Sequence, residues 1–163
     1  MKNKILQGYL SDFQNDYNLY KKKEDILFEH FCNYCIISKV HPEAFYDDNF
    51  KIEDINVGGG QDTGIDGIAI IINDHLVSSI EEIDSLKDQF QRLDVRFIFT
   101  QSKTSDEFKS SEIGNFIYGV KDFFKDKPTL KTSDDILHLR SLKDYIYSNS
   151  ILMDDPQYVN STI

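Results

Sequence analysis

Two apolar, strand-like segments constrain this sequence most, because each carries polar side chains at one end. The first covers residues 65–72 and has Asp66 at its start. The second covers residues 95–101, ends at Gln101 and is followed by Lys103. Side chains alternate between the two faces of a strand, so Gln101 and Lys103 are expected to point to the same face. We expect the two segments to pair in one sheet and to bring Asp66, Gln101 and Lys103 together.

These three side chains have the chemistry of a metal-dependent hydrolase. Mg²⁺ and Mn²⁺ prefer oxygen ligands, which the Asp66 carboxylate and the Gln101 amide supply. Lys103 is suited to orient and deprotonate an attacking water, or to stabilise negative charge that develops on a phosphoryl group. The pattern therefore predicts hydrolysis of a phosphodiester with Mg²⁺ or Mn²⁺. The simpler alternative is a turn aspartate at Asp66 and an ordinary polar strand end at Gln101 and Lys103.

Three segments together resemble a known group of nucleases. They are FEHFC at 28–32, GGGQDTGIDG at 58–67 and FIFTQSKT at 97–104. In this order they resemble the PD-(D/E)XK nuclease superfamily, in the Mrr-like variant where glutamine replaces the second acid. Within it they are most similar to the N-terminal region of the AIPR (abortive infection phage resistance) proteins, over roughly residues 20–127. The resemblance implies a restriction-endonuclease-like fold and an endonuclease of prokaryotic anti-phage defence, acting on DNA in preference to RNA.

Glu29 is the third candidate metal ligand. It lies at the border of the apolar stripe of an expected helix over residues 24–38, on one face with Cys32, Asn33 and Ile36. In Mrr-like nucleases a glutamate from the first core helix adds an acid to the metal site, and the position of Glu29 resembles it. The alternative is a solvated helix glutamate. Asp62, in the glycine-rich loop, is a weaker candidate.

The remaining patterns predict an α/β domain, in which a small mixed sheet is flanked by helices on both faces. The expected order is helices over 4–20 and 24–38, an edge strand over 50–55, a hairpin of 65–72 with 76–78 turning at Asn73 and Asp74, a helix over 81–93, a buried strand over 95–101, and helices over 113–124 and 134–147. We divide residues 1–163 as one domain into an N-terminal helix (1–22), a core (24–127) and a C-terminal helix (133–150).

Composition limits the setting of this domain. With 163 residues the chain has the length of one domain. It lacks both a run of about 18 apolar residues and a signal-peptide core, so we expect a cytoplasmic protein without a membrane partner. The sequence ends without a clear stop, which predicts further domains in a longer chain. It leaves open whether the protein forms a homodimer. Cys32 and Cys35 stand without further ligands at zinc spacing, which favours two buried packing cysteines.

The net charge of −10 opposes a tight grip on nucleic acid, because such proteins usually carry a basic face. Bound metal or other domains of a longer chain would have to supply the missing attraction. Two other functions remain open at this point. One is a catalytically inactive nuclease-like domain that serves as a nucleic-acid or protein interaction module. The other is an acidic protein–protein module in which the two strand motifs are accidental.

Overall fold

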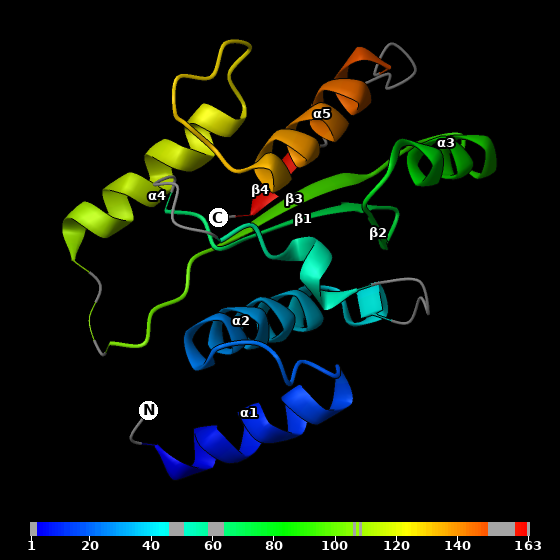
Figure 1. The fold of residues 1–163 in the computed structure, drawn as a ribbon. Coiled ribbons are helices and arrows are strands. Elements are labelled where there is room, and N and C mark those ends of the chain that lie inside the picture. The colour runs from blue at the N-terminus through cyan, green and yellow to red at the C-terminus, as the bar shows by residue number, and fades with distance from the viewer. Residues whose placement is uncertain are drawn as a thin grey trace.

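The computed structural model describes residues 3–45, 51–58, 64–105, 107 and 109–149, together with the backbone of 159–162. The elements follow the chain in the order shown in Figure 1. They are α1 (Lys4–Asp16), α2 (Glu24–Val40), η1 (Pro42–Phe45), η2 (Ile52–Ile55), β1 (Gly67–Ile72), β2 (His75–Val77), α3 (Ile80–Gln89), β3 (Val95–Thr100), α4 (Ser110–Phe123), α5 (Asp134–Ser148) and β4 (Val159–Thr162).

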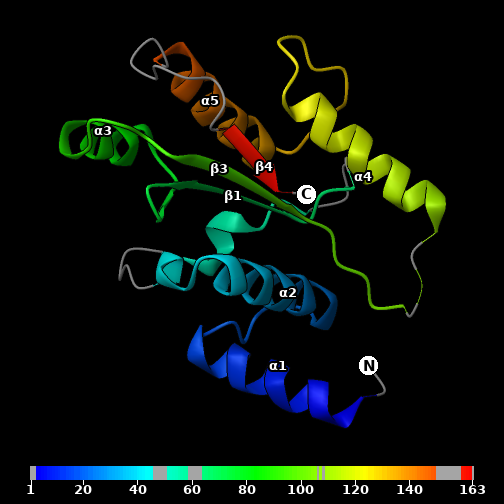
Figure 2. The same ribbon diagram turned by 180° about the vertical axis from the view of Figure 1, so that it is seen from behind.

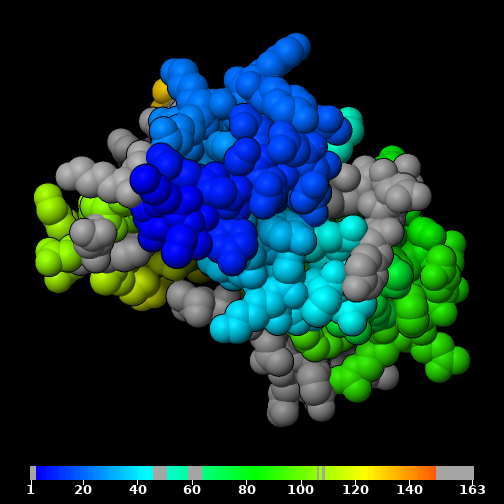
Figure 3. Space-filling model, turned by 90° about the horizontal axis from the view of Figure 1, so that it is seen from below, coloured from blue at the N-terminus to red at the C-terminus, as the bar shows by residue number. Residues whose placement is uncertain are grey.

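The sheet is mixed and lies between two helical layers. Its order is β2-β1-β3-β4; β1 pairs antiparallel with β2 and β3, and β4 runs parallel to β3. Helices α1 and α2 lie on one side, and α4 and α5 lie on the other (Figures 1 and 2). Seen from below, the two N-terminal helices, coloured blue, cover the centre of that face (Figure 3). The predicted α/β class is confirmed, including the hairpin turn, where Asn73 and Asp74 have φ of 48° and 66°.

Strand β1 has a core on each face. All six of its residues are buried. Ile68, Ile70 and Ile72 pack into the core that α4 and α5 cover, whereas Ala69 and Ile71 pack into the core beneath α1 and α2. Full burial of an isoleucine side chain stabilises a fold by about 1.5–3 kcal/mol. A strand apolar on both faces is therefore fixed in register, and the residues that flank it are fixed with it.

The edge strand expected over 50–55 is wrong for the described part of that range, which contains η2. Ile52 and Ile55 are three residues apart and both are buried, which one helical turn achieves and an extended strand does not. The Asp54 carboxylate accepts a hydrogen bond from the Lys51 N–H at 3.3 Å and closes the turn. Phe50 lies outside the described residues.

Three expected helices differ in length or orientation. Helix α1 ends at Asp16 rather than at 20, because Asn18 adopts a left-handed φ of 56°. Helix α3 ends at Gln89 rather than at 93, because the chain turns back to the sheet, where the Asn73 side chain accepts from the Asp94 N–H at 2.7 Å. In α4 the expected apolar residues Ile113 and Ile117 are 46% and 38% exposed. The first half of α4 projects beyond the end of the sheet (Figure 1), and the fully buried residues of the helix lie in its second half. Among the described helices, none has the length and apolar character needed to cross a membrane.

Candidate active site

The main chain of Asp66 is held from both sides. Its N–H donates to the Thr100 carbonyl at 2.9 Å, just beyond the last pair of the β1–β3 ladder. Its own carbonyl accepts from the N–H groups of Val57 and Gly58 at 3.0 and 3.3 Å. Gly67 pairs with Thr100, so Asp66 and Gln101 flank the same end of two antiparallel strands. The sheet therefore presents Asp66 at the end of the two inner strands, where the sequence predicts a site.

The Asp66 side chain is tied to the loop that follows β3. Its Oδ2 accepts from the Ser102 N–H at 2.6 Å and from the Ser102 hydroxyl at 3.1 Å. The pKa of the Asp66 carboxyl is raised, because burial raises it by more than the two Ser102 donors lower it. Asp66 is thus a half-buried carboxylate with one oxygen already oriented by protein donors.

Glu29 lies beside this carboxylate. Burial, followed by the charges of Asp66 and Asp25, raises the pKa of Glu29 to about 7. Among the described residues, none hydrogen-bonds to its buried Oε2. A Cβ on Gly58 would stand 2.9 Å from this oxygen and 3.8 Å from the Asp66 Cα, so the glycine leaves the space that the carboxylate occupies. Helix α2 and the start of β1 therefore bring two acids to one place.

Gln101 and Lys103 do not continue the strand. Strand β3 ends at Thr100, and the chain leaves the ladder because the Ser102 N–H bonds the Asp66 carboxylate. The expectation that Gln101 and Lys103 share a strand face is wrong for this reason. Gln101 is half-buried next to the ladder's end. Lys103 is also half-buried, and its ammonium group donates to both carboxylate oxygens of Glu112 in α4.

Asn33 joins the parts of this site, although no sequence pattern predicts a role for it. It is fully buried in α2, one helical turn after Glu29. Its amide donates to the Asn56 Oδ1 at 3.1 Å and to the Asp66 carbonyl at 3.4 Å, and its oxygen accepts from the Thr100 hydroxyl. A polar residue in the apolar stripe of a helix was the available signal.

Gly67→Ala is expected to lower the free energy of unfolding by about 1–3 kcal/mol, because overpacking forces fixed groups apart. A Cβ there would lie 2.5 Å from the Asn33 Nδ2 and would also contact the Thr100 hydroxyl. Urea denaturation measures the change. Gly114→Ala in α4 is the matched control, since a Cβ there meets nothing within 4 Å, and it is expected to stabilise by about 0.5–1 kcal/mol. Equal effects of the two substitutions would contradict this packing.

The acids at this edge fit a Mg²⁺ or Mn²⁺ ion held partly by water. Mg²⁺ is usually bound through one or two carboxylates and retains several waters. Glu29 and Asp66 are the two carboxylates, and Gln101 offers a third oxygen. Within the described ranges, no three His, Cys, Asp or Glu side chains are grouped to hold a metal. Asp62 lies outside the described residues.

The cysteine pair differs from its expectation. Cys35 is exposed and Cys32 is half-buried, so they are not two core residues. Both lie off the buried face of α2, which Leu27, His30, Asn33 and Ile37 form. Burial, then Cys35, Asp66 and Glu29, raise the pKa of Cys32 to about 11. A thiol with so high a pKa is a poor nucleophile at neutral pH.

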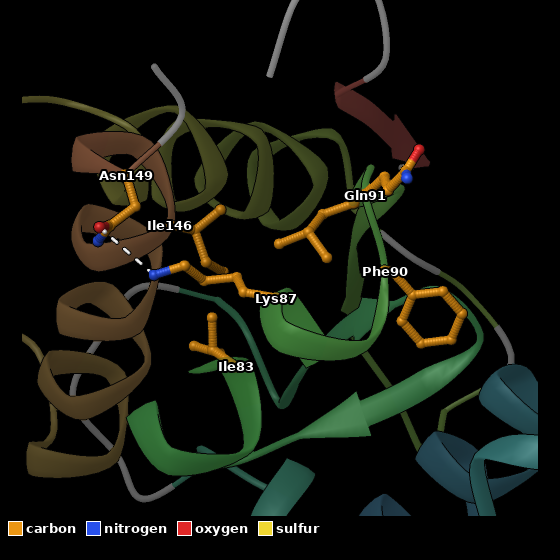
Figure 4. Close-up of a pocket in the computed structure, with 7 residues that line it drawn as sticks. Ile83, Lys87, Phe90, Gln91, Ile146 and Asn149 are labelled. Carbon is orange, nitrogen blue, oxygen red and sulfur yellow. Dashed lines mark hydrogen bonds between the residues drawn. The ribbon is translucent and has the colours of Figure 1, made fainter. Parts of the chain in front are cut away.

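A hollow of about 180 Å³ lies away from these acids, between α3 and α5. Figure 4 shows its lining, in which Lys87 and Asn149 form a 3.5 Å hydrogen bond at one side of an otherwise largely apolar wall. None of the predicted site residues lines it.

Compared with models of known protein families, with curated proteins and with solved structures, the chain has no match.

Glu29→Gln is expected to stabilise the protein above pH 7 and to have little effect below about pH 4.5. The folded-state pKa of about 7 exceeds the ordinary value of 4.5, so the folded protein binds more protons between these limits. Stability of the wild type therefore falls as pH rises through this window, and the glutamine variant does not share that fall.

Melting temperatures at pH 5, 6, 7 and 8 in metal-free buffer measure this effect for wild type and variant. Glu43→Gln, at an exposed position of η1, is the control for loss of one negative charge. A difference between wild type and Glu29→Gln that is the same at every pH would show that Glu29 is not the titrating group.

Proposed function

We propose that this chain is a restriction-endonuclease-like nuclease domain that hydrolyses phosphodiester bonds with Mg²⁺ or Mn²⁺. Its preferred substrate is DNA rather than RNA, and its setting is prokaryotic anti-phage defence in the cytoplasm, as one domain of a longer chain. The observation that carries the proposal is the pair of acids, Glu29 and Asp66, which lie close together at the end of the paired strands β1 and β3. The mixed sheet between helical layers supports it.

Each protein group has a distinct part in this chemistry. Asp66, Glu29 and Gln101 would hold the ion. When bound, it polarises the phosphoryl group and makes a coordinated water easier to deprotonate. Ser102 keeps the Asp66 carboxylate oriented through its N–H and hydroxyl. Lys103 brings positive charge to the same loop, where it can stabilise the charge that develops on the phosphoryl oxygens.

An inactive nuclease-like interaction module is the second candidate. Two observations favour it: Gln101 stands where a second strand acid is more usual, and Lys103 is ion-paired with Glu112. A neutral amide lowers the negative charge available to a divalent cation. Such a module would bind a nucleic acid or a protein partner without cutting it.

The test is a cleavage assay on supercoiled plasmid, linear DNA and RNA, with Mg²⁺, with Mn²⁺ and with chelator. We expect metal-dependent cutting of DNA by the intact protein and a fall of roughly 10²–10⁴ in rate for Lys103→Ala, the usual size for a lost proton-handling or charged group. Lys121→Ala, an exposed position of α4, is the control. Equal cleavage by wild type and Lys103→Ala, in a preparation free of contaminating nuclease, would assign the activity elsewhere.

A further inference from the structure

Helix α4 differs from the other α-helices in the charge that it exposes. Each of α1, α2, α3 and α5 exposes at least two carboxylates, in keeping with the net charge of −10. Among these five described helices, α4 alone has no carboxylate among its exposed residues. Its two acids are engaged within the fold, because Glu112 pairs with Lys103 and Asp122 is fully buried. The surface of α4 therefore does not repel a polyanion as the other helices do.

A line of polar side chains follows one side of α4. Ser111, Asn115 and Tyr118 are exposed, and their spacing of four and three residues puts them on the same side of the helix. They span about 10 Å along its axis. Just beyond the helix, the Lys125 ammonium group lies 4.9 Å from the centre of the Tyr118 ring. Lys125 also pairs with the buried Asp122 at 2.9 Å, and 40% of its side chain stays exposed. Hydroxyl, amide and ammonium groups are common donors to the phosphates of nucleic acids.

This side of α4 borders the candidate active site. A Cβ on Gly64 would stand 3.0 Å from the Phe116 nitrogen and 3.4 Å from the Asn115 carbonyl carbon. Gly64 comes two residues before Asp66, so the main chain of α4 lies within about 12 Å of the Asp66 Cα. Each strand of a DNA duplex carries one phosphate per about 3.4 Å of its axis. A strand bound at Asp66 therefore has phosphates, about three or four nucleotides away, at the distance of α4.

We propose that the side of α4 formed by Ser111, Asn115 and Tyr118, together with Lys125, is a nucleic-acid contact surface that holds the sugar–phosphate strand of duplex DNA beside the candidate active site. The inference rests on the proposed function for its choice of partner. Charge complementarity supports it, because hydrogen-bond donors and an ammonium group without exposed acids match phosphates, which accept hydrogen bonds and are negative. The surface has few cations, so it positions the strand and binds it weakly.

Two matched pairs of lysines test where DNA is bound. Ser111→Lys with Asn115→Lys adds two charges to α4, and Ser85→Lys with Gln89→Lys adds two at the same spacing to the exposed side of α3. Helix α3 lies at the other end of the sheet (Figure 1). Fluorescence anisotropy in chelator measures binding to a labelled duplex at roughly 50 and 200 mM salt. At the lower salt we expect the α4 pair to raise the affinity at least about tenfold, and the α3 pair by less than about threefold. Equal gains would overturn the proposal.

Two substitutions that conserve size test the same surface with the opposite charge. Asn115→Asp and Gln89→Glu each change an exposed amide into a carboxylate. We expect Asn115→Asp to weaken the binding of the same duplex by at least about threefold, because it puts a negative charge against the phosphates, and Gln89→Glu to change it by less than about twofold. An affinity that Asn115→Asp leaves unchanged would contradict a contact at this position.

Cleavage and self-association distinguish this inference from its rivals. Ile113 and Ile117 are exposed apolar side chains on a different side of α4. If Ile117→Glu breaks a dimer seen by sedimentation and neither lysine pair changes DNA binding, α4 is a protein interface and the proposal is wrong. If the wild type cuts DNA with Mn²⁺ but the two pairs bind alike, the nuclease function stands and this surface is wrong. If the α4 pair alone gains affinity and the wild type cuts no nucleic acid, the surface stands and the nuclease function fails.

Discussion

Asp66→Asn is expected to abolish metal-dependent cleavage and to remove most of the rise in melting temperature that millimolar Mn²⁺ produces in the wild type. Asparagine keeps the size of the side chain and an oxygen that can accept from the Ser102 N–H, so the fold should persist. It removes one of the two carboxyl groups at the candidate site, and divalent cations depend on such groups for binding. The wild type should melt at a higher temperature with Mn²⁺ by mass action.

Asp88→Asn, on the exposed side of α3, is the control for Asp66→Asn. A melting temperature that stays flat across millimolar Mn²⁺ in the wild type and in Asp66→Asn would favour the inactive interaction module. A DNA-binding measurement tests the effect of the net charge separately. At −10 net charge this chain alone should hold DNA weakly even at low salt, so tight binding without metal would contradict the electrostatic argument.

Asp122→Ala is expected to lower the free energy of unfolding by about 3–5 kcal/mol, the usual effect of breaking a buried charged network. Asp122 is fully buried near the end of α4. Its carboxylate accepts from the N–H groups of Thr129 and Leu130 at 2.9 and 3.0 Å and from the Lys125 ammonium at 2.9 Å. Alanine would leave these donors without their acceptor and would release the loop that leads to α5.

Lowering the pH should weaken the same hydrogen-bond network around Asp122. Burial alone would raise the pKa of Asp122, but the donors, led by the Thr129 N–H, hold it well below its usual range. A depressed folded-state pKa contributes stability above the ordinary value of 3.8, and that stability is lost as pH falls below it. Urea denaturation at pH 7 and pH 3 measures both effects, with the exposed Asp126→Ala as control. A change in unfolding free energy under 1 kcal/mol at pH 7 would show that water replaces the carboxylate.

The strands and most helices are predictable from this sequence because their signals are local. Continuous apolar runs indicate β1 and β3, and Asn73 with Asp74 indicates the turn between β1 and β2, where left-handed φ is required. Helix α4 shows the limit of such signals. Its apolar spacing suggests burial along its whole length, but Ile113 and Ile117 are exposed. Spacing reports which side chains share a face and not what that face meets.

The candidate site is only partly predictable for the same reason. The placement of Asp66 and Gln101 follows from pairing two strands, and Glu29 was assigned through the resemblance to Mrr-like nucleases. The rest of the candidate site depends on contacts between segments that are far apart in the sequence. Asn33 meets Thr100 across 67 positions of sequence, and Ser102 meets Asp66 across 36. The second of these bonds ends β3, and so it also decides where Lys103 goes.

The excursion between β1 and β3 offers a place where this chain can be lengthened. Residues 73–94 leave β1 and return to β3 at Ile72 and Val95, which pair with each other. The Asn73 N–H donates to the Asp94 carbonyl at 2.9 Å and closes the excursion at its base. Six-residue strands separate this base from Asp66 by roughly 20 Å. A reporter or an additional domain joined within the excursion would therefore leave the opposite end of the sheet undisturbed.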